Sequence, residues 1–312
     1  MKPFAFVFPG QGSQSVGMLD AWGDHPAVSE TVQEASAALG EDLARLMREG
    51  PKEALDLTTN TQPVMLTAAV ACYRAWLAEG GAAPAAVAGH SLGEYSALVA
   101  AGALTLADAV PLVRLRAQAM QDAVPVGVGA MAAVLGLEAQ AVVDGCAQAA
   151  AATGEVVSAA NFNDPKQVVI AGTKAGVDKA CEILKAAGAK RALLLPVSAP
   201  FHCALMAPAA QRLRERLAEV QIRTPDIPVI HNIDAAAHPD PQALRDALFR
   251  QAAGPVRWVD VVHALRSRGL EHVLECGPGK VLSGLVKRID PALASMTVFD
   301  PPSLAQAREM LV

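Results

Sequence analysis

The first hydrophobic segment of the chain is Phe4–Phe8, a run without a polar residue that stops at the turn Pro9-Gly10-Gln11-Gly12. A short apolar run that ends in a glycine-rich turn is typical of a buried strand. Ala85–Ala88 has the same character and runs into Gly89. Helical patterns accompany these two strands: Thr61–Leu77 with Pro63 in its first turn, Glu94–Ala101 closed by Gly102, and a helix opened by Thr105 and Asp108 that runs to about Asp122.

The middle of the chain has shorter predicted elements, which follow the order β-α-β-β-α-β. This order is typical of the split βαβ or ferredoxin-like unit. The predicted elements are Ala130–Leu135, Ala139–Ala152, Val156–Ala160, Gln167–Ala171, Ala175–Ala187 and Ala192–Val197. We therefore predict a small subdomain over residues 126–197, inserted into a larger one.

The last third returns to longer alternating elements: strands at Ile227–Ile233 and Val273–Glu275, and helices at Pro241–Gln251 and Val256–Arg268. Strands that alternate with helices predict an α/β fold with a mainly parallel sheet. We expect residues 1–125 and 198–312 to form one large subdomain, with the active site in the cleft beside the inserted one.

Composition excludes several classes of protein. The 312 residues are 52% hydrophobic and only 18% charged, which excludes a disordered chain. A net charge of −5, with no long basic run, argues against a nucleic-acid partner. No apolar run is long enough to span a bilayer, and no basic leader segment precedes the first strand, so we expect no membrane association. Five scattered cysteines without CxxC spacing or clustered histidines predict reduced thiols, a cytoplasmic location and no metal site.

One pentapeptide carries candidate chemistry: Gly89-His90-Ser91-Leu92-Gly93 matches G-x-S-x-G between a predicted strand and a predicted helix. A sharp turn at this place lifts a serine hydroxyl above the sheet and sets it at a helix N-terminus, where developing negative charge is stabilised. The five-residue pattern alone is equally compatible with an ordinary glycine-rich turn. Its strand–turn–helix setting favours a nucleophilic Ser91.

A serine nucleophile needs a base, and His202 is the best placed of the seven histidines. It follows the predicted strand at Ala192–Val197 on an irregular loop, where functional side chains often lie. A solvated or capping role is the alternative for a lone loop histidine. His90 is expected to point away from Ser91, and His231 and His263 to lie at the edge of the core. No acidic residue stands in an obvious third position, so a main-chain carbonyl could orient the imidazole.

Arg116 lies in an apolar helix stripe, with Leu112, Val113, Ala119 and Met120 three or four residues away. An inward arginine is costly unless it meets an anion, and its planar fork suits a carboxylate. A structural arginine, ion-paired or reaching out to solvent, is the alternative. The turn Gly277-Pro278-Gly279-Lys280 before a predicted helix could bind a phosphate, although a turn-and-cap role fits its spacing better.

Several motifs in one order resemble the acyltransferases of fatty-acid and polyketide synthesis that move malonyl groups from coenzyme A to acyl carrier protein. They are Phe8–Gly12, Gly89–Tyr95, Arg116 with Met120, Asn161–Asn163, Pro196–His202 and Glu275–Lys280. They cover nearly the whole chain, and together they are far more specific than any one of them.

The resemblance implies an α/β-hydrolase-like large subdomain and a role for each candidate residue. Ser91 would carry the acyl group as an ester, and His202 would act as general base and acid, oriented by the main-chain carbonyl of Gln251. The amides of Gln11 and Leu92 would form the oxyanion hole, while Arg116 would hold the free carboxylate of the malonyl group.

By the same resemblance, malonyl-CoA and acyl carrier protein are the partners, no cofactor is needed because the CoA thioester is itself a substrate, and we expect a monomer. Phe201 resembles the residue of malonyl-selective members. Basic residues that could contact the carrier protein or the CoA phosphates, or simply be solvated, are Lys185, Lys190, Arg191, Lys280, Lys287 and Arg288. Two rival functions stay open on the motif alone: a thioesterase-type hydrolase and a non-catalytic module that binds carrier protein.

Overall fold

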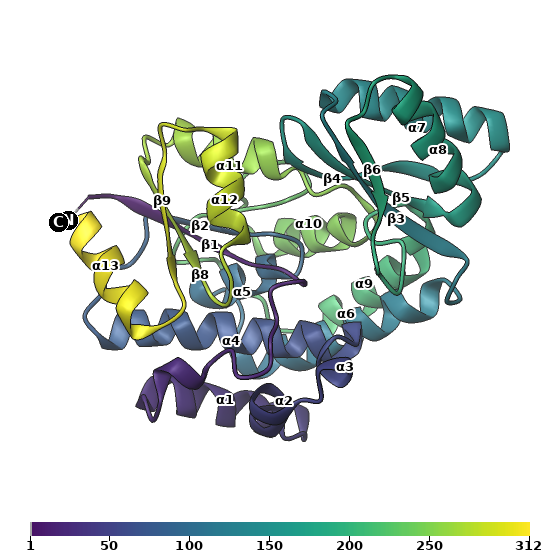
Figure 1. Cartoon of the computed structure of the whole chain (residues 1–312). Helices are drawn as coiled ribbons and strands as arrows, with labels where there is room; N and C mark the ends of the chain where they lie inside the picture. The colour runs from purple at the N-terminus through teal and green to yellow at the C-terminus, as the bar shows by residue number, and fades with distance from the viewer. Residues whose placement is uncertain (1) are drawn as a thin grey trace.

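A five-stranded parallel sheet forms the centre of the computed structural model, which describes residues 2–312 (Figure 1). Every pair of neighbouring strands in it is parallel. In spatial order the strands are β7 (Val229–Ile230), β2 (Ala86–Gly89), β1 (Phe4–Phe8), β8 (His272–Cys276) and β9 (Ala294–Val298). The mainly parallel α/β sheet predicted from the alternation of elements is therefore confirmed.

Both faces of this sheet are covered, which explains the unbroken apolar run of β1. Phe4, Phe6 and Phe8 pack into one core with helix α4, whereas Ala5 and Val7 pack into a second core with helices α11 and α12. Figure 1 shows α4 and α12 on opposite sides of the sheet. The helices outside the small unit defined below are α1 (Pro26–Leu39), α2 (Leu43–Glu49), α3 (Lys52–Leu55), α4 (Thr58–Ala78), α5 (Gly93–Ala100), α6 (Leu106–Ala123), α9 (Ala207–Glu219), α10 (Pro241–Ala253), α11 (Trp258–Ser267), α12 (Val281–Ile289) and α13 (Pro301–Leu311).

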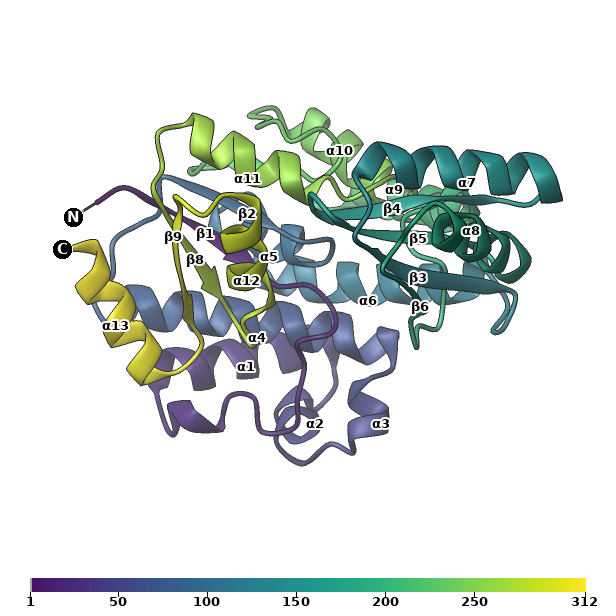
Figure 2. The same ribbon diagram turned by 45° about the horizontal axis from the view of Figure 1, so that its top comes forward.

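Residues 129–194, here called the small unit, form a separate four-stranded antiparallel sheet beside the parallel one (Figure 2). Two helices pack on one face of it through a compact apolar core. Its elements are β3 (Gly129–Leu135), α7 (Ala139–Thr153), β4 (Val157–Asp164), β5 (Gln167–Thr173), α8 (Lys174–Ala186) and β6 (Arg191–Leu194), with the strands in the order β4-β5-β3-β6. The predicted element order of this segment is confirmed.

Five predicted elements needed correction. The strand predicted over Val156–Ala160 continues to Asp164. Helix α4 begins at Thr58, because the Leu57 carbonyl accepts from the N–H of Asn60 and Thr61, so Pro63 lies inside the helix and not in its first turn. Strand β6 ends before Pro196, which cannot donate to a ladder. Two other segments are shorter than predicted: Ile227–Ile233 contributes only Val229–Ile230 to the sheet, and Val256–Arg268 is helical only over Trp258–Ser267.

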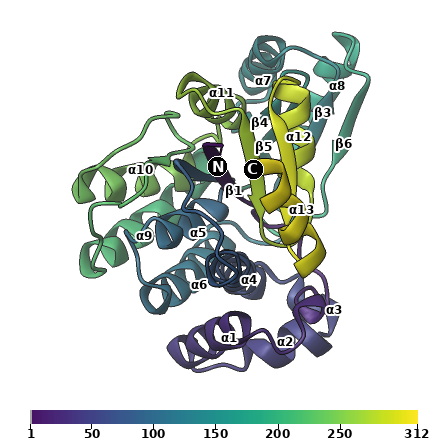
Figure 3. The ribbon, with the colours of Figure 1, turned by 90° about the vertical axis from the view of Figure 1, so that its left-hand side faces the viewer.

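Val256 lies before helix α11 and pairs with a strand of the small unit. Its N–H donates to Ala160, and its carbonyl accepts from Phe162, so β4 is hydrogen-bonded to the chain that follows α10. The two ends of the described chain are also adjacent, since the Lys2 N–H donates to the Leu311 carbonyl at 2.8 Å (Figure 3). Among residues 2–312, no helix is both long and apolar enough to cross a membrane.

Candidate active site

The turn at Ser91 is a strained connection between β2 and α5. Ser91 has a positive φ of 51°, which is unusual for a residue with a side chain. The glycines on either side leave no room for a Cβ: one at Gly89 would lie 1.9 Å from the carbonyl carbon of Gly93, and one at Gly93 would lie 2.1 Å from the Phe8 oxygen. Helix and strand therefore approach so closely that only glycine fits at both places.

His202 lies against this hydroxyl although 111 positions separate the two residues. Its Nε2 is 2.7 Å from Ser91 Oγ, and its Nδ1 is 3.0 Å from the main-chain oxygen of Gln251 and 3.2 Å from that of Gly254. A carbonyl can only accept, so Nδ1 carries the proton and Nε2 is free to accept from the serine. Burial, and secondarily the charge of Arg116, lowers the pKa of His202 to about 3, which keeps the imidazole neutral.

Arg116 projects into the same place from α6 and is only 2% exposed. Its guanidinium donates to Gln62 Oε1 at 2.8 Å, to Gln251 Oε1 at 3.0 Å and to Ser91 Oγ at 3.2 Å. All three acceptors are neutral. Burial lowers the pKa of Arg116, but a guanidinium stays charged in proteins, so the site holds a desolvated cation without a direct carboxylate partner.

Two main-chain amides beside Ser91 are open to a ligand. Neither the N–H of Leu92 nor that of Gln11 donates a hydrogen bond within residues 2–312, and both residues line the cavity at Ser91. The Ser91 N–H is occupied, since it donates to Asn232 Oδ1 at 2.7 Å. Free amides at a strand end and a helix N-terminus can stabilise an oxyanion.

The cavity at Ser91 measures about 650 Å³ and lies between the parallel sheet and the small unit. Ser91, His202 and Arg116 line it from one side, and Met131, Asn161 and Val169 line it from the other. The segment Leu195–Val197 and Phe201 complete the wall. Five of the six candidate residues thus line one cavity, and the sixth, Gln251, contacts His202 from behind. The five are Gln11, Ser91, Leu92, Arg116 and His202.

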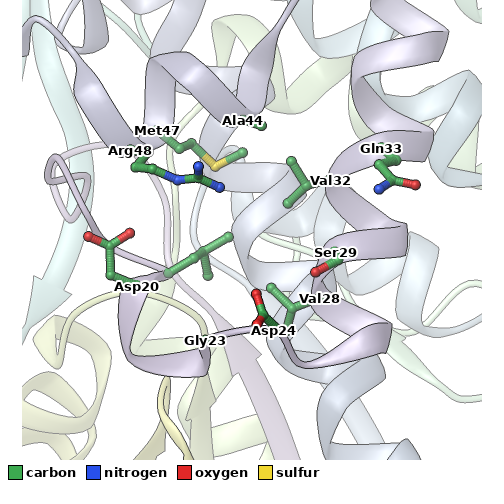
Figure 4. Close-up of a pocket in the computed structure, with 11 residues that line it drawn as sticks. Asp20, Gly23, Asp24, Val28, Ser29, Val32, Gln33, Ala44, Met47 and Arg48 are labelled. Carbon is green, nitrogen blue, oxygen red and sulfur yellow. The ribbon is translucent and has the colours of Figure 1, made fainter.

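A second hollow, of about 480 Å³, lies between the turn at Asp20–Trp22, α1 and α2 (Figure 4). Apolar side chains such as Val28, Val32 and Met47 line it, with Asp20 and Arg48 among the charged ones. It shares no lining residue with the Ser91 cavity and contains neither histidine nor cysteine. The chemistry-bearing residues therefore concentrate in the other cavity.

The remaining histidines differ from each other in a way that the sequence pattern did not predict. His90 points away from Ser91, as expected, and its Nε2 lies 2.8 Å from Asn163 Oδ1 in β4. His231 is completely buried beyond the end of β7, with Nδ1 2.7 Å from Glu94 Oε1. His263 is exposed on α11, so its expected place at the edge of the core was wrong: Val261, Val262 and Leu265 form the inward stripe of that helix instead.

The turn Gly277–Lys280 leads into a helix whose N-terminus is already occupied by a side chain of the protein itself. Glu275 at the end of β8 turns its carboxylate onto the first turn of α12, where Oε2 accepts from Ser283 N at 2.8 Å and from Ser283 Oγ at 2.9 Å. The helix N-terminus already holds an anion of the chain itself, so the phosphate alternative loses its physical basis and the turn-and-cap interpretation is favoured.

The other residues singled out in the sequence lie as follows. All five cysteines are buried and unpaired with each other, and burial raises the pKa of Cys72 and Cys146 to about 12. Arg288 is held by Asp164 of β4 at 2.8 Å and is therefore not a free basic residue. No cluster of three or more metal-ligating side chains occurs in the described part of the chain.

Sequence reasoning missed three buried polar residues behind the site: Gln62, Glu94 and Asn232. Glu94 follows the pentapeptide directly and is completely buried, so its place in the motif was the available signal. Nothing in the sequence around Asn232 or Gln62 indicated their contacts, which depend on elements far apart in the chain.

Fold and site together place a hydrogen-bonded serine–histidine pair in a cavity at the end of a parallel α/β sheet. A family model described as "Acyl transferase domain" matches residues 5–290. The chain belongs to this acyl transferase family and, within it, to the malonyl CoA-acyl carrier protein transacylases.

The relatives support this assignment over the full length. The chain is 54% identical to the malonyl CoA-acyl carrier protein transacylase of Escherichia coli strain K12, over 99% of this chain and 100% of that protein. It matches the crystal structure of an acyl-carrier-protein S-malonyltransferase from Burkholderia pseudomallei 1710b with a TM-score of 0.97 and 64% identity, over 99% and 100% of the two chains. It also matches a malonyl-transacylase in complex with a type II PKS acyl-carrier protein, with a TM-score of 0.96 and 48% identity over 99% and 100%.

Proposed function

We propose that this protein transfers the malonyl group of malonyl-CoA to the phosphopantetheine thiol of acyl carrier protein through an ester on Ser91. The observation that carries the proposal is the Ser91–His202 contact of 2.7 Å with the buried guanidinium of Arg116 donating to the same hydroxyl. The names of the full-length relatives give the same donor and acceptor.

In the first half-reaction Ser91 Oγ attacks the thioester carbonyl while its proton passes to Nε2 of His202. The carbonyl oxygen becomes an oxyanion, which the amides of Gln11 and Leu92 stabilise by a few kcal/mol each. Collapse breaks the carbon–sulfur bond, and the leaving thiolate of CoA takes the proton back from His202. The products are free CoA and malonyl-Ser91.

The second half-reaction runs the same steps with a new thiol. His202 accepts the proton of the phosphopantetheine thiol, whose sulfur attacks the ester carbonyl. The bond to Ser91 Oγ breaks, and the serine recovers its proton from His202. The carbonyls of Gln251 and Gly254 hold the ring in one tautomer throughout and take the place of a carboxylate as its orienting partner.

Arg116 selects the acyl group in this scheme. Its partners in the free protein are neutral amides and a hydroxyl, which a carboxylate can displace with a net gain because charge-assisted hydrogen bonds are the stronger ones. The guanidinium would hold the free malonyl carboxylate and so place the thioester carbonyl over Ser91. A thioesterase would have little use for a buried arginine at this position.

We further propose that residues 1–125 and 198–312 form an α/β-hydrolase-like subdomain and residues 126–197 a ferredoxin-like one. The strand order β4-β5-β3-β6 and the two helices on one face support the second assignment. We propose action as a monomer. We also propose that no cofactor is needed, since His202 accepts and returns every proton in the steps above. Five free, buried cysteines favour a reducing, cytoplasmic compartment.

The direct test is mass spectrometry of the protein after incubation with malonyl-CoA, followed by addition of the phosphopantetheinylated carrier protein. We expect a malonyl adduct on Ser91 that persists in water and disappears when the carrier protein is added, with malonyl-carrier protein formed in equal amount. An adduct that decays equally fast without carrier protein would identify a hydrolase. Absence of any adduct would leave only a binding module and would contradict the proposal.

A further inference from the structure

A buried carboxylate lies directly beneath the site and has no place in the scheme above. Glu94, in the first turn of α5, is 0% exposed. Its Oε1 contacts Nδ1 of His231 at 2.7 Å, and its Oε2 accepts from the main-chain N–H of Asn232 at 2.9 Å and from Nε2 of Gln251 at 3.2 Å. A desolvated carboxylate costs several kcal/mol unless hydrogen bonds and opposite charge offset the loss of water.

The side chain of Gln251 links this carboxylate to the buried guanidinium. Gln251 Oε1 accepts from Arg116 Nη2 at 3.0 Å, while Gln251 Nε2 donates to Glu94 Oε2. The result is a hydrogen-bonded chain from cation to anion through one neutral amide. Burial lowers the pKa of Arg116, and the negative charge of Glu94 acts against that lowering.

The amide between the two charges has a consequence for ligand binding. A carboxylate in direct contact with Arg116 would occupy the fork of the guanidinium and compete with an acidic ligand. A carboxylate one residue away compensates the buried charge by Coulomb attraction, which is long-ranged at low dielectric, and leaves the fork to neutral partners that are displaced more easily.

We propose that Glu94 is a positioning residue that serves as the remote counter-charge of Arg116, holding the guanidinium buried and charged through Gln251 and setting how strongly the site binds a dicarboxylic acyl group. The proposal rests on the proposed function, because it needs an acyl substrate with a free carboxylate. The same residue is joined to the nucleophile, since Asn232, whose N–H it accepts, bonds Ser91 N through Oδ1 and Gly89 O through Nδ2 at 2.6 Å.

The substitution Glu94→Gln removes the negative charge of this side chain while it keeps the hydrogen bonds. The new amide keeps an oxygen for Asn232 and Gln251 and places its NH₂ against Nδ1 of His231. His231 can then accept at Nδ1 by moving its proton to Nε2, which has no partner among the described residues. The hydrogen bonds are preserved while the pair of buried charges changes from a net zero to +1.

The sign of the effect follows from that change. A more positive site binds an anionic acyl group more tightly and leaves a neutral one unaffected. We expect Glu94→Gln to lower the half-saturating concentration of malonyl-CoA in single-turnover acylation by about tenfold, with no change for acetyl-CoA. Equal changes for both thioesters, or weaker binding of malonyl-CoA, would overturn the inference, because a carboxylate that only braces the fold cannot distinguish the two acyl groups.

Two further variants keep the inference testable if Glu94→Gln folds poorly. In the charge swap Glu94→Gln with Gln251→Glu, the anion stands next to Arg116, so the half-saturating concentration of malonyl-CoA should rise relative to that of acetyl-CoA measured on the same variant. In an Arg116→Gln background, Glu94→Gln should lose its selective effect. A swap that leaves malonyl-CoA unchanged, or selectivity that persists without Arg116, would contradict the coupling.

Glu275→Gln is the matched control. It removes another buried carboxylate, one that contacts Ser283 and lies outside the Ser91 cavity, and should leave the ratio of the two half-saturating concentrations unchanged. Wild-type protein that forms no malonyl adduct would contradict the proposed function. A normal adduct combined with an unselective Glu94→Gln would contradict only the role of Glu94.

Discussion

Two turns of the same parallel sheet join a strand to a helix through glycines and use them in opposite ways. At the end of β2, the turn at Ser91 leaves the amide of Leu92 free and lifts a hydroxyl into a cavity. At the end of β8, the turn Gly277–Lys280 leads into a helix whose first turn is already occupied by Glu275. The first turn is open to a ligand, and the second is closed by the chain itself.

Each turn has a buried glutamate, and its position decides the difference. Glu275 precedes its turn, at the strand end, so its carboxylate reaches the amides of the following helix. Glu94 follows its turn and lies within helix α5, so its carboxylate contacts His231 and Asn232 after β7. The N-terminus of α5, at Ser91 and Leu92, is therefore not filled by this carboxylate. A glycine-rich turn before a helix is therefore an anion site only where no carboxylate of the chain fills it.

The largest expected effect is on malonyl transfer, and it distinguishes Ser91 from Ser283, the serine in the helix that follows the second turn. Ser91→Ala should reduce malonyl transfer by at least about 10⁴-fold, because Ser91 has the only hydroxyl among the described residues that line the cavity. Ser283→Ala removes a partner of Glu275 and should retain the adduct while losing about 1–2 kcal/mol of unfolding free energy. Intact-protein mass spectrometry and urea unfolding measure the two results. A covalent adduct on Ser91→Ala protein would overturn the contrast.

Next in size is the effect of the arginine that faces the open turn. Arg116→Ala should weaken malonyl transfer by about 10–100-fold, the value of a charged hydrogen-bonded contact, and raise relative transfer of acetyl or similar neutral groups. Arg114→Ala is the control, since Arg114 faces outward and pairs with Glu41 at 2.7 Å. Steady-state kinetics with both thioesters provides the measurement, and an unchanged preference for malonyl-CoA would refute the role of Arg116.

The dependence of kcat/KM on pH below 7 tests whether His202 is buried. In the proposed mechanism His202 must be neutral to accept a proton, and burial lowers its pKa to about 3 from an ordinary 6.5. The rate kcat/KM reports ionisations of the free enzyme. It should therefore show no decline as pH falls through 6.5 and should decrease only at markedly lower pH, as long as the protein is folded. A half-maximal rate near pH 6.5 would show that the imidazole is solvated.

The smallest effect concerns stability at the closed turn. Burial raises the pKa of the Glu275 carboxyl above its ordinary 4.5, so the folded protein binds this proton more tightly than the unfolded chain does. The unfolded chain then loses this proton at lower pH than the folded protein, and the resulting contribution to stability is full below pH 4.5 and declines as pH rises through the folded pKa. Relative to Glu275→Gln, wild type should thus lose unfolding free energy as pH rises above 4.5. A difference that is constant with pH would argue against a raised pKa.

Much of the fold followed from local pattern. The helices at Leu106–Ala123 and Ala139–Thr153 and the strand Phe4–Phe8 have strong periodicity or clear caps, and their bounds were predicted to within one or two residues. One error falls where a residue has a long-range partner: Val256 pairs with β4 instead of continuing a helix. Six α-helices and strands in segments without an assigned pattern, among them α1, α9 and β9, were not predicted, nor were two short 3-10 helices.

The candidate site divides in the same way. Ser91 has a local signature because a nucleophile at a strand-to-helix turn requires glycines at fixed spacing, and Arg116 has one because its neighbours at helical spacing are apolar. His202 was favoured only by its place on a loop, and the role of Gln251 came from the resemblance alone. Their contact depends on how α10 lies against the loop after the small unit. Glu94 had a place in the motif but no evident partner.

The sequence by itself determined the strained turn, the inward arginine and the alternation that requires a parallel sheet, because these depend on sterics and spacing within a few residues. Only the tertiary structure decided which imidazole meets Ser91, that a main-chain carbonyl orients it, and that an amide separates Arg116 from Glu94. It also decided which glycine-rich turn stays open. The contacts behind the first three of these outcomes join residues 49 to 157 positions apart, and no local pattern records such distances.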